Sequence, residues 1–163
     1  MRFPFGAAAA ACAAGAFLTL AAAPADPVAW KIEGAPARVK AGARFDLKLV
    51  ARIQDGWHMY SLKPVEDGPI PTRIWLAEGQ PLQLAGPIEA AEPEKLQDPS
   101  LGMEVELYEG EADFTLPLRV AANAPAGPLT VVVNASYQSC NNKLCLPPKT
   151  VKVEAAVVVV VGR

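Results

Sequence analysis

Residues 137–148, Tyr-Gln-Ser-Cys-Asn-Asn-Lys-Leu-Cys-Leu-Pro-Pro, are the stretch around which the rest of this sequence is organised. They contain Cys140 and Cys145, and a strand-like run from Leu129 to Tyr137 leads into them. A second strand-like run begins at Thr150. Two strands joined by a short polar turn place both cysteines at the tip of a β-hairpin, where they can form a disulfide if their Cβ atoms converge.

The first 25 residues have the pattern of a cleavable signal peptide. Arg2 supplies a positive charge, an alanine-rich apolar run follows, and small residues end it at Ala23 and Ala25. We expect cleavage after Ala25, which leaves residues 26–163 as the mature domain. Cleavage after Ala23 and an uncleaved membrane anchor are the alternatives. Cys12 lies within the apolar run, and we expect it to be removed with the signal.

Composition and charge argue against several classes of function. The chain has 163 residues and a net charge of −2, without a basic stripe, which argues against a nucleic-acid partner. Beyond the signal-like segment, no apolar stretch reaches the length that spans a membrane. Export would place the chain in an oxidising compartment, where a disulfide persists. We therefore expect one exported domain with a disulfide.

Short β-strands account for the hydrophobic pattern of the mature region. The chain contains 16 prolines and 12 glycines, and no long run has the 3.6-residue period of an amphipathic helix. Arg44–Ile53 alternates apolar and polar residues, which predicts a strand that is buried on one face. About eight such strands predict an all-β antiparallel sandwich of two sheets. The other expected strands are Val28–Glu33, Thr72–Leu76, Glu104–Glu109, Ala112–Val120, Leu129–Tyr137 and the run from Thr150.

Three segments do not fit a simple strand pattern. Residues 63–71 are rich in proline and predict a loop. Residues 87–102 are rich in proline and acidic side chains, which predicts an irregular segment at the surface. Val157–Val161 is unbroken valine. It is either a final paired strand or an exposed tail with a tendency to aggregate, and the sequence leaves both open.

The cysteine pair has two interpretations as a disulfide. The first is a structural bridge that staples a hairpin in a secreted sandwich. A loop this short stabilises a fold by only about 2 kcal/mol, against roughly 4.7 kcal/mol for a 100-residue loop, so stapling is a weak use of the pair. The second is a redox-active pair at an exposed tip, where a thiolate of a partner protein can reach it. Lys143 and Lys149 would modestly favour a thiolate there.

A metal site is the third interpretation of these residues. The single histidine, His58, could combine with the cysteines, Met59 and Met103 to form a copper site in a β-sandwich. Most known sites of this kind need at least two histidines beside the thiolate, and this chain has one. We therefore expect no metal and no other cofactor. His58 is expected to be a packed or hydrogen-bonded residue.

Four motifs occur in order along the mature region. They are Gly56–Ser61, the loop Asp98–Gly102, Tyr108–Gly110, and Tyr137–Cys140 with Cys145–Pro148. With these motifs the chain resembles the periplasmic N-terminal domain of the DsbD thiol:disulfide interchange family, also described as a disulfide bond corrector domain. The Tyr-Gln-x-Cys…Cys-x-Pro-Pro element is the specific motif, and the other three are individually weak.

The resemblance implies an immunoglobulin-like sandwich with the cysteine pair on a hairpin at one end. Such a domain is a component of a periplasmic thiol:disulfide oxidoreductase system that acts on protein partners. It receives electrons from a thioredoxin-like protein or a DsbD-type membrane donor. It passes them to a periplasmic disulfide isomerase or thiol reductase, in pathways that include cytochrome c maturation. We expect a monomer that binds no nucleic acid.

The resemblance also implies roles for individual residues. Cys145 forms the intermolecular disulfide, and Cys140 resolves it. The hairpin is expected to be supported by Tyr137 and Gln138 before the cysteines and by Pro147 and Pro148 after them. The rival interpretation is a secreted binding sandwich whose bridge is inert and which transfers nothing.

Two features depart from the family pattern. In the family a cap loop shields the cysteines with aromatic side chains, whereas the matching residues here, 98–103, include no aromatic. On this loop, which contains Asp98 and Gly102, Leu101 and Met103 are expected to provide the cover. Packing at the edge of the core is the alternative. The better-known members also continue into a membrane domain and a thioredoxin domain, so we expect this chain to meet its electron donor as a separate protein.

Overall fold

The computed structural model describes residues 25–98 and 101–161. The expected signal peptide therefore lies outside the described residues except for Ala25, and the expected cap loop is described without Pro99 and Ser100. The described residues form strands and turns, and none of them forms a helix long and apolar enough to cross a membrane. The strands are β1 (Val28–Gly34), β2 (Arg38–Lys40), β3 (Arg44–Ile53), β4 (His58–Tyr60), β5 (Arg73–Leu76), β6 (Leu82–Leu84), β7 (Glu89–Ala90), β8 (Glu94–Asp98), β9 (Met103–Tyr108), β10 (Glu111–Val120), β11 (Gly127–Tyr137), β12 (Ser139–Cys140) and β13 (Lys149–Val160).

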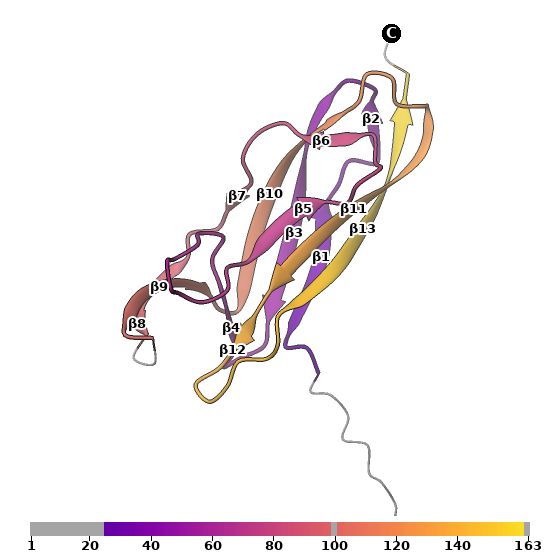
Figure 1. The fold of residues 1–163 in the computed structure, drawn as a ribbon. Helices are drawn as coiled ribbons and strands as arrows, with labels where there is room; N and C mark the ends of the chain where they lie inside the picture. The colour runs from indigo at the N-terminus through magenta and orange to yellow at the C-terminus, as the bar shows by residue number, and fades with distance from the viewer. Residues whose placement is uncertain (1–24, 99–100, 162–163) are drawn as a thin grey trace, which may run out of the picture.

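Two sheets pack face to face and enclose the main core (Figure 1). One has the strand order β1-β3-β10-β6, with β7 also paired to β10, and the other has the order β2-β13-β11-β5. Strand β10 alternates, and its inward side chains between Ala112 and Val120 are fully buried. They pack in one cluster with the inward side chains of β11 between Val131 and Tyr137. The prediction of an all-β, immunoglobulin-like sandwich is confirmed.

Four aromatic rings fill one end of this core. Phe114 of β10 stacks on Trp30 of β1 at a centroid distance of 5.7 Å and meets the edge of Tyr108 at 5.6 Å. Trp30 also contacts Tyr137, the last residue of β11, at 5.4 Å. Aromatic pairs in these geometries stabilise the core beyond the apolar area that they bury. The rings therefore join four strands just below the point where the chain enters the cysteine stretch.

A third, smaller sheet stands at one end of the sandwich. Its strand order is β12-β4-β9-β8. Strand β9 continues into β10 through the turn at Glu109–Gly110, so the small sheet is joined directly to the main core. In Figure 1 the loop after β12 lies at the end where the described chain begins, and β13 ends at the opposite end of the sandwich. The prediction of two sheets was incomplete, because β4 and β12 are too short to give a periodic pattern.

Residues 87–102 lie at the surface as predicted, but the prediction that this segment is irregular was wrong. It contains β7 and β8, and β8 pairs with β9 from Glu94↔Leu107 to Asp98↔Met103. Strand β8 lies at the edge of the small sheet, and its side chains from Glu94 to Gln97 are all exposed. A strand without a buried face shows no alternation of apolar and polar residues, so its sequence looks like a loop.

For the valine run, the structure shows the paired strand rather than a tail. Strand β13 pairs with β11 over eleven registered positions, and Val157 and Val159 are 1% and 2% exposed. Its last residues also pair with β2, and this short pairing is parallel. The named strands pair antiparallel elsewhere, as predicted, and the exception is at this edge, where β2 lies alongside β13.

Candidate functional site

A disulfide between Cys140 and Cys145 closes the hairpin that follows β12. The two Cα atoms are 4.0 Å apart, and the two residues also form an isolated antiparallel bridge. The backbone N–H of Leu146 donates to the carbonyl of Ser139 over 2.8 Å. Residues 139–146 therefore form a small ladder, which we call the cysteine hairpin.

Polar side chains hold the turn of the cysteine hairpin. Asn141 Oδ1 accepts hydrogen bonds from the backbone N–H groups of Lys143 and Leu144, both at 2.9 Å. The N–H of Asn141 donates to the carbonyl of Leu144 over 2.9 Å. Gln138 Nε2 reaches across to the carbonyl of Leu146 over 3.1 Å. Asparagine favours such turns because its side chain can replace a backbone acceptor, so much of the hairpin geometry is held independently of the disulfide.

The two bridged cysteines differ in exposure. Cys140 is 1% exposed and packs in a small apolar cluster that includes Tyr60 and Leu107. Cys145 is exposed, and its neighbour Leu144 is 50% exposed. The rate of thiol–disulfide exchange depends on which sulfur an incoming thiolate can reach. Cys145 is therefore the accessible member of the bridge, whereas Cys140 is shielded by the fold.

The register of the small sheet brings distant residues to the side of Cys140. Strand β12 pairs Cys140 with His58 of β4, and β4 pairs Tyr60 with Leu107 of β9. Directly opposite residues in antiparallel strands share a face, and alternate residues along a strand return to it. We call the face that carries Cys140 the cysteine face. Its residues are Cys140, His58, Tyr60, Met103, Val105, Leu107, Glu94, Leu96 and Asp98.

Two titratable residues of β4 lie on the cysteine face. The His58 ring meets the Tyr60 ring edge-on, with the centroids 5.4 Å apart. Burial lowers the pKa of His58, and the carboxylates of Glu109 and Asp98 oppose this shift. Burial also raises the pKa of Tyr60, and the carboxylate of Asp98 raises it further. Both side chains are therefore uncharged at neutral pH.

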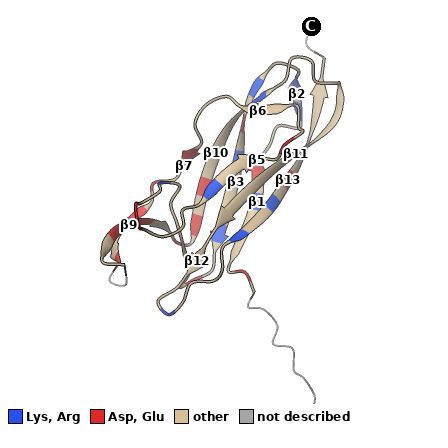
Figure 2. Cartoon of the chain, in the orientation of Figure 1, with Lys and Arg blue, Asp and Glu red and all other residues tan. Residues whose placement is uncertain are grey.

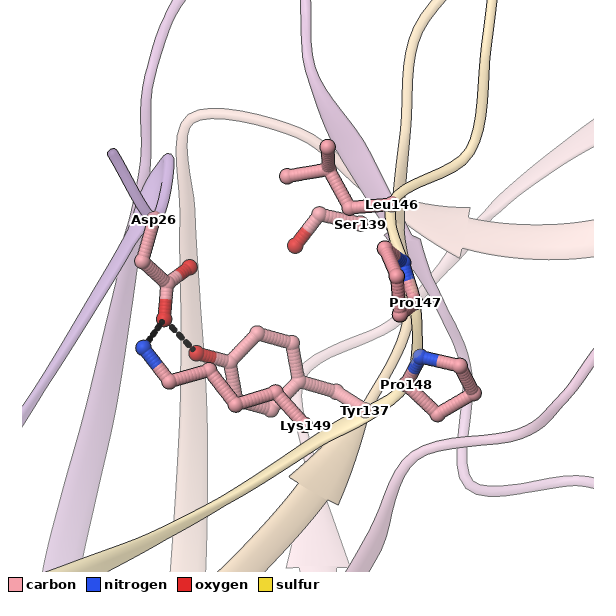
Figure 3. A pocket seen from close by; sticks show the side chains of 7 residues that line it. All are labelled: Asp26, Tyr137, Ser139, Leu146, Pro147, Pro148 and Lys149. Atoms are coloured by element: carbon pink, nitrogen blue, oxygen red, sulfur yellow. Dashed lines mark hydrogen bonds and ion pairs between the residues drawn. The ribbon is translucent and has the colours of Figure 1, made fainter. Parts of the chain in front are cut away.

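A cavity of about 360 Å³ lies at the base of the hairpin (Figure 3). Tyr137 and Lys149 are cross-strand partners there, and the carboxylate of Asp26 accepts a hydrogen bond from each, at 2.8 Å from Lys149 Nζ. Burial by itself raises the pKa of Asp26, but the bonds from Lys149, Tyr137 and the N–H of Val28 hold it below its ordinary value. Asp26 thus links β11 and β13, the two strands that flank the cysteine hairpin. The lining residues are Asp26, Tyr137, Ser139, Leu146, Pro147, Pro148 and Lys149.

Charges of opposite sign flank the two cysteines. Figure 2 shows acidic residues along β9 and a basic residue at the tip of the hairpin after β12. Lys143 lies in the hairpin turn, close in sequence to Cys145, whereas the carboxylates of Asp98 and Glu109 act on His58, the partner of Cys140. A nearby cation favours a thiolate and a nearby anion disfavours it.

Comparison with known families decides what kind of domain this is. Residues 31–156 match the family described as "Thiol:disulfide interchange protein DsbD, N-terminal". The chain belongs to the DsbD N-terminal family. The resemblance seen in the sequence motifs is confirmed. Thiol:disulfide interchange is the chemistry for which this family is named, and the described chain carries a cysteine pair suited to it.

One solved structure shows that the fold is shared. The N-terminal periplasmic domain of ScsB from Proteus mirabilis is 14% identical, with a TM-score of 0.50. The match covers 78% of this chain and 44% of that one, so the DsbD N-terminal domain described here spans less than half of the matched chain. AvmM, which catalyses macrocyclization in alchivemycin A biosynthesis, is 7% identical with a TM-score of 0.36, covering 79% of this chain and 88% of that one. A family 123 glycoside hydrolase from Clostridium perfringens is 10% identical with a TM-score of 0.34, and the match covers 83% of this chain and 28% of that one. No curated protein matches the chain.

The residues expected to form the cap loop of the DsbD N-terminal domain lie at the turn between β8 and β9. Asp98 and Met103 are paired there, and the N–H of Gly102 donates to the carbonyl of Asp98 over 2.8 Å. Gly102 has a φ of 67°, which favours glycine. Met103 packs against the cluster that contains Cys140, whereas Leu101 is 40% exposed. The structure thus brings Asp98 and Met103 to the cysteine face and leaves Leu101 at the turn.

Two residues of the site were not predicted from the sequence. His58 was expected to be a packed or hydrogen-bonded residue, and its position opposite Cys140 in the sheet register was not predicted. Asp26 was expected only as the first residue of the mature domain, but it bonds to both arms of the hairpin. The motif Gly56–Ser61 was the signal that could have pointed to His58. No group of three or more His, Cys, Asp or Glu side chains among residues 25–98 and 101–161 is arranged to hold a metal ion.

Proposed function

We propose that this domain is an exported thiol:disulfide interchange module. It relays electrons from a thioredoxin-like protein, or a DsbD-type membrane donor, to periplasmic oxidoreductases of the disulfide isomerase or thiol reductase type. The observation that carries the proposal is the asymmetric bridge of a DsbD N-terminal family member, in which Cys145 is exposed and Cys140 is buried. Thiol–disulfide exchange needs one reachable sulfur and a second sulfur that can displace the partner.

Reduction of the domain begins at the exposed sulfur. A thiolate of the donor attacks Cys145 Sγ, the bond between Cys145 and Cys140 breaks, and Cys140 leaves with the electron pair. A second thiol of the donor then attacks the donor sulfur that is bonded to Cys145. This step forms a disulfide in the donor and releases Cys145 as a thiolate. In the other half of the cycle, Cys145 attacks the disulfide of the acceptor. Cys140 then attacks Cys145 Sγ and releases the reduced acceptor.

Export is part of the same proposal. It is supported by the signal-like pattern of residues 1–25 and by the periplasmic origin of the ScsB domain whose fold this chain shares. An oxidising compartment allows the disulfide to form, and continued reduction then requires a dedicated electron donor. The domain would work there as a monomer, without a cofactor, on protein partners.

The rival function is a secreted binding sandwich with an inert bridge. Two features favour exchange over stapling. The disulfide closes only its own turn, which stabilises a fold by only about 2 kcal/mol. The arms of the hairpin are also held by the Asn141 turn, by Gln138 and by the bonds of Asp26 to Tyr137 and Lys149. A bridge that adds little to the fold can be opened and closed without unfolding it.

A redox titration tests the proposed function. We use a Cys12→Ser background, which leaves Cys140 and Cys145 as the only cysteines. Equilibration with glutathione buffers is expected to titrate the bridge within the glutathione range, and a purified, reduced thioredoxin is expected to open it. The reduced protein should keep a cooperative thermal transition, since about 2 kcal/mol is small against a typical stability of roughly 5–15 kcal/mol. A bridge that neither buffer nor thioredoxin opens, or a reduced protein without a transition at room temperature, would favour the inert staple.

Met103 is expected to provide the cover of Cys140, with Leu101 as a matched control on the same turn. In a Cys12→Ser, Cys145→Ser background the only thiol belongs to Cys140. Met103→Ala is expected to speed alkylation of this thiol severalfold, because Met103 packs against the cluster that contains it. Leu101→Ala should leave the alkylation rate unchanged, because Leu101 is 40% exposed. An unchanged rate for Met103→Ala, or a loss of stability above about 2 kcal/mol, would assign Met103 to packing.

A further inference from the structure

The Nε2 atom of His58 is buried, and it has no hydrogen-bond partner among the residues that the structure describes. A buried polar atom without a partner is costly, so each one calls for a physical explanation. His58 lies directly opposite Cys140 in the β4–β12 pairing, and both side chains are on the cysteine face. In the bridged state Cys140 has no S–H group. Opening of the bridge creates one on the residue that lies opposite His58 in the small sheet.

The proposed function requires Cys140 to gain and lose a proton in each cycle. Cys140 leaves as a thiolate when the bridge opens, and it must be a thiolate again when it attacks Cys145. It is 1% exposed and lies among apolar side chains, so water has little access to its sulfur. Burial of this kind disfavours the thiolate. A proton acceptor on the cysteine face would remove this obstacle.

The surroundings of His58 suit that task. Opposing residues in an antiparallel pair have Cβ atoms about 4.5–5.5 Å apart, which places an imidazole within reach of a thiol. Tyr60 of β4 lies edge-on to the ring, Asp98 of β8 and Glu109 after β9 act on it by charge, and Cys140 faces it from β12. Burial outweighs the two carboxylates, so the imidazole is neutral at neutral pH and able to accept a proton.

We propose that His58 is the proton partner of Cys140. This inference rests on the proposed function. When the bridge opens, the S–H of Cys140 donates a hydrogen bond to Nε2 of His58. When the bridge closes, that proton moves to Nε2, and the electron pair left on sulfur attacks Cys145 Sγ. The bond from Cys145 to the partner breaks, and the partner leaves as a thiolate. The imidazolium returns its proton to the next Cys140 thiolate that forms, or to solvent.

A small aromatic disulfide reagent that releases a coloured thiolate tests this step without any protein partner. The reduced Cys12→Ser protein first reacts through the exposed Cys145, which releases one equivalent of coloured thiolate. Attack by Cys140 then closes the bridge and releases the second equivalent. The rate of this second phase, measured from mildly acidic to alkaline pH, reports the resolving step alone.

His58→Gln is expected to slow the second phase roughly 100-fold at neutral pH, within the range of general base catalysis. The difference should vanish at alkaline pH, where Cys140 is already a thiolate. A structural role would instead slow the reaction equally at every pH. His58→Phe, which keeps an aromatic ring, should behave like His58→Gln, and either variant suffices if the other fails to fold.

Second-phase rates of wild type and variant that coincide at all pH values, or that differ by a constant factor, would overturn the inference. A different result would contradict the proposed function: the wild-type bridge would close normally with the reagent but would not exchange with thioredoxin. The two failures are therefore distinguishable.

Discussion

Cys145→Ser is expected to abolish mixed-disulfide formation with a partner, and Cys140→Ser is expected to trap the mixed disulfide. In Cys145→Ser the remaining thiol belongs to Cys140, which is 1% exposed and packs among apolar side chains. A partner cannot reach it. In Cys140→Ser the remaining thiol belongs to the exposed Cys145, which can join a partner but has no neighbouring thiol to release it.

The measurement uses a thioredoxin with a single active-site cysteine, activated as an aromatic disulfide, and non-reducing electrophoresis. Both variants carry Cys12→Ser, and both should show a thermal transition close to that of the reduced wild type. Cys140→Ser is expected to form a covalent complex with most of the thioredoxin, and Cys145→Ser to form almost none. Equal trapping by the two variants would show that burial of Cys140 does not decide the order of attack, and the assigned roles would then be wrong.

Tyr137→Ala is expected to lower the free energy of unfolding by about 3–5 kcal/mol, the range for loss of a large buried aromatic side chain. Tyr137 is 1% exposed, contacts Trp30, and donates its hydroxyl to Asp26. Tyr137→Phe keeps the ring and loses only the hydrogen bond. Because the acceptor is a carboxylate, we expect this variant to cost about 1.5–3 kcal/mol.

The pH dependence of stability separates the contribution of the hydrogen bond to Asp26 from that of the buried ring of Tyr137. The pKa of Asp26 in the folded protein lies below its ordinary value of 3.8, so its stabilisation is present above pH 3.8 and is lost as the pH falls further. The difference between wild type and Tyr137→Phe should therefore shrink in strong acid. Burial, and then Asp26, raise the pKa of Tyr137 above its ordinary value of 10.0. Wild type should therefore also lose stability as the pH rises beyond 10.0 and through the higher pKa of the folded state.

Denaturant unfolding of the purified protein at neutral and acidic pH measures both effects. Leu84→Ala is the control, because Leu84 is 41% exposed and its truncation should change the stability by less than about 0.5 kcal/mol. A Tyr137→Phe difference that stays constant down to strong acid would show that the bond to the Asp26 carboxylate contributes nothing.

The larger strands were predictable because one face of each is buried. Arg44–Ile53 was predicted with the bounds that the structure has, since its alternation of apolar and polar residues reports the core directly. The small sheet was not predictable in this way. Strands β4 and β12 have three and two residues, too few for a period, and β8 has no fully buried side chain. The pairings of β4 with β12 and with β9 are set by contacts between segments that lie far apart in the chain.

The same limit applies to the candidate site. The cysteine pair is visible in the sequence because its two members are close together and flanked by strand and turn residues. The role of His58 depends on its register with Cys140, and that of Asp26 on the register of Tyr137 with Lys149. Neither register follows from spacing along the chain. The cover of the cysteine was assigned from the sequence to Leu101 and Met103 together, and only the sheet register separates Met103 from the exposed turn.

The opposite placement of the two ends of the described chain decides how the protein can be attached to a surface. Strand β13 ends far from the cysteine hairpin, whereas Asp26 stands at the base of that hairpin (Figure 1). A label, a fluorophore or an electrode linker attached after Val160 would leave Cys145 facing solution. The same group attached directly before Asp26 would lie beside the cysteines and next to the bond between Asp26 and Tyr137. For electrochemistry on an immobilised film, attachment through the end of β13 is therefore the orientation that presents the disulfide to a soluble partner.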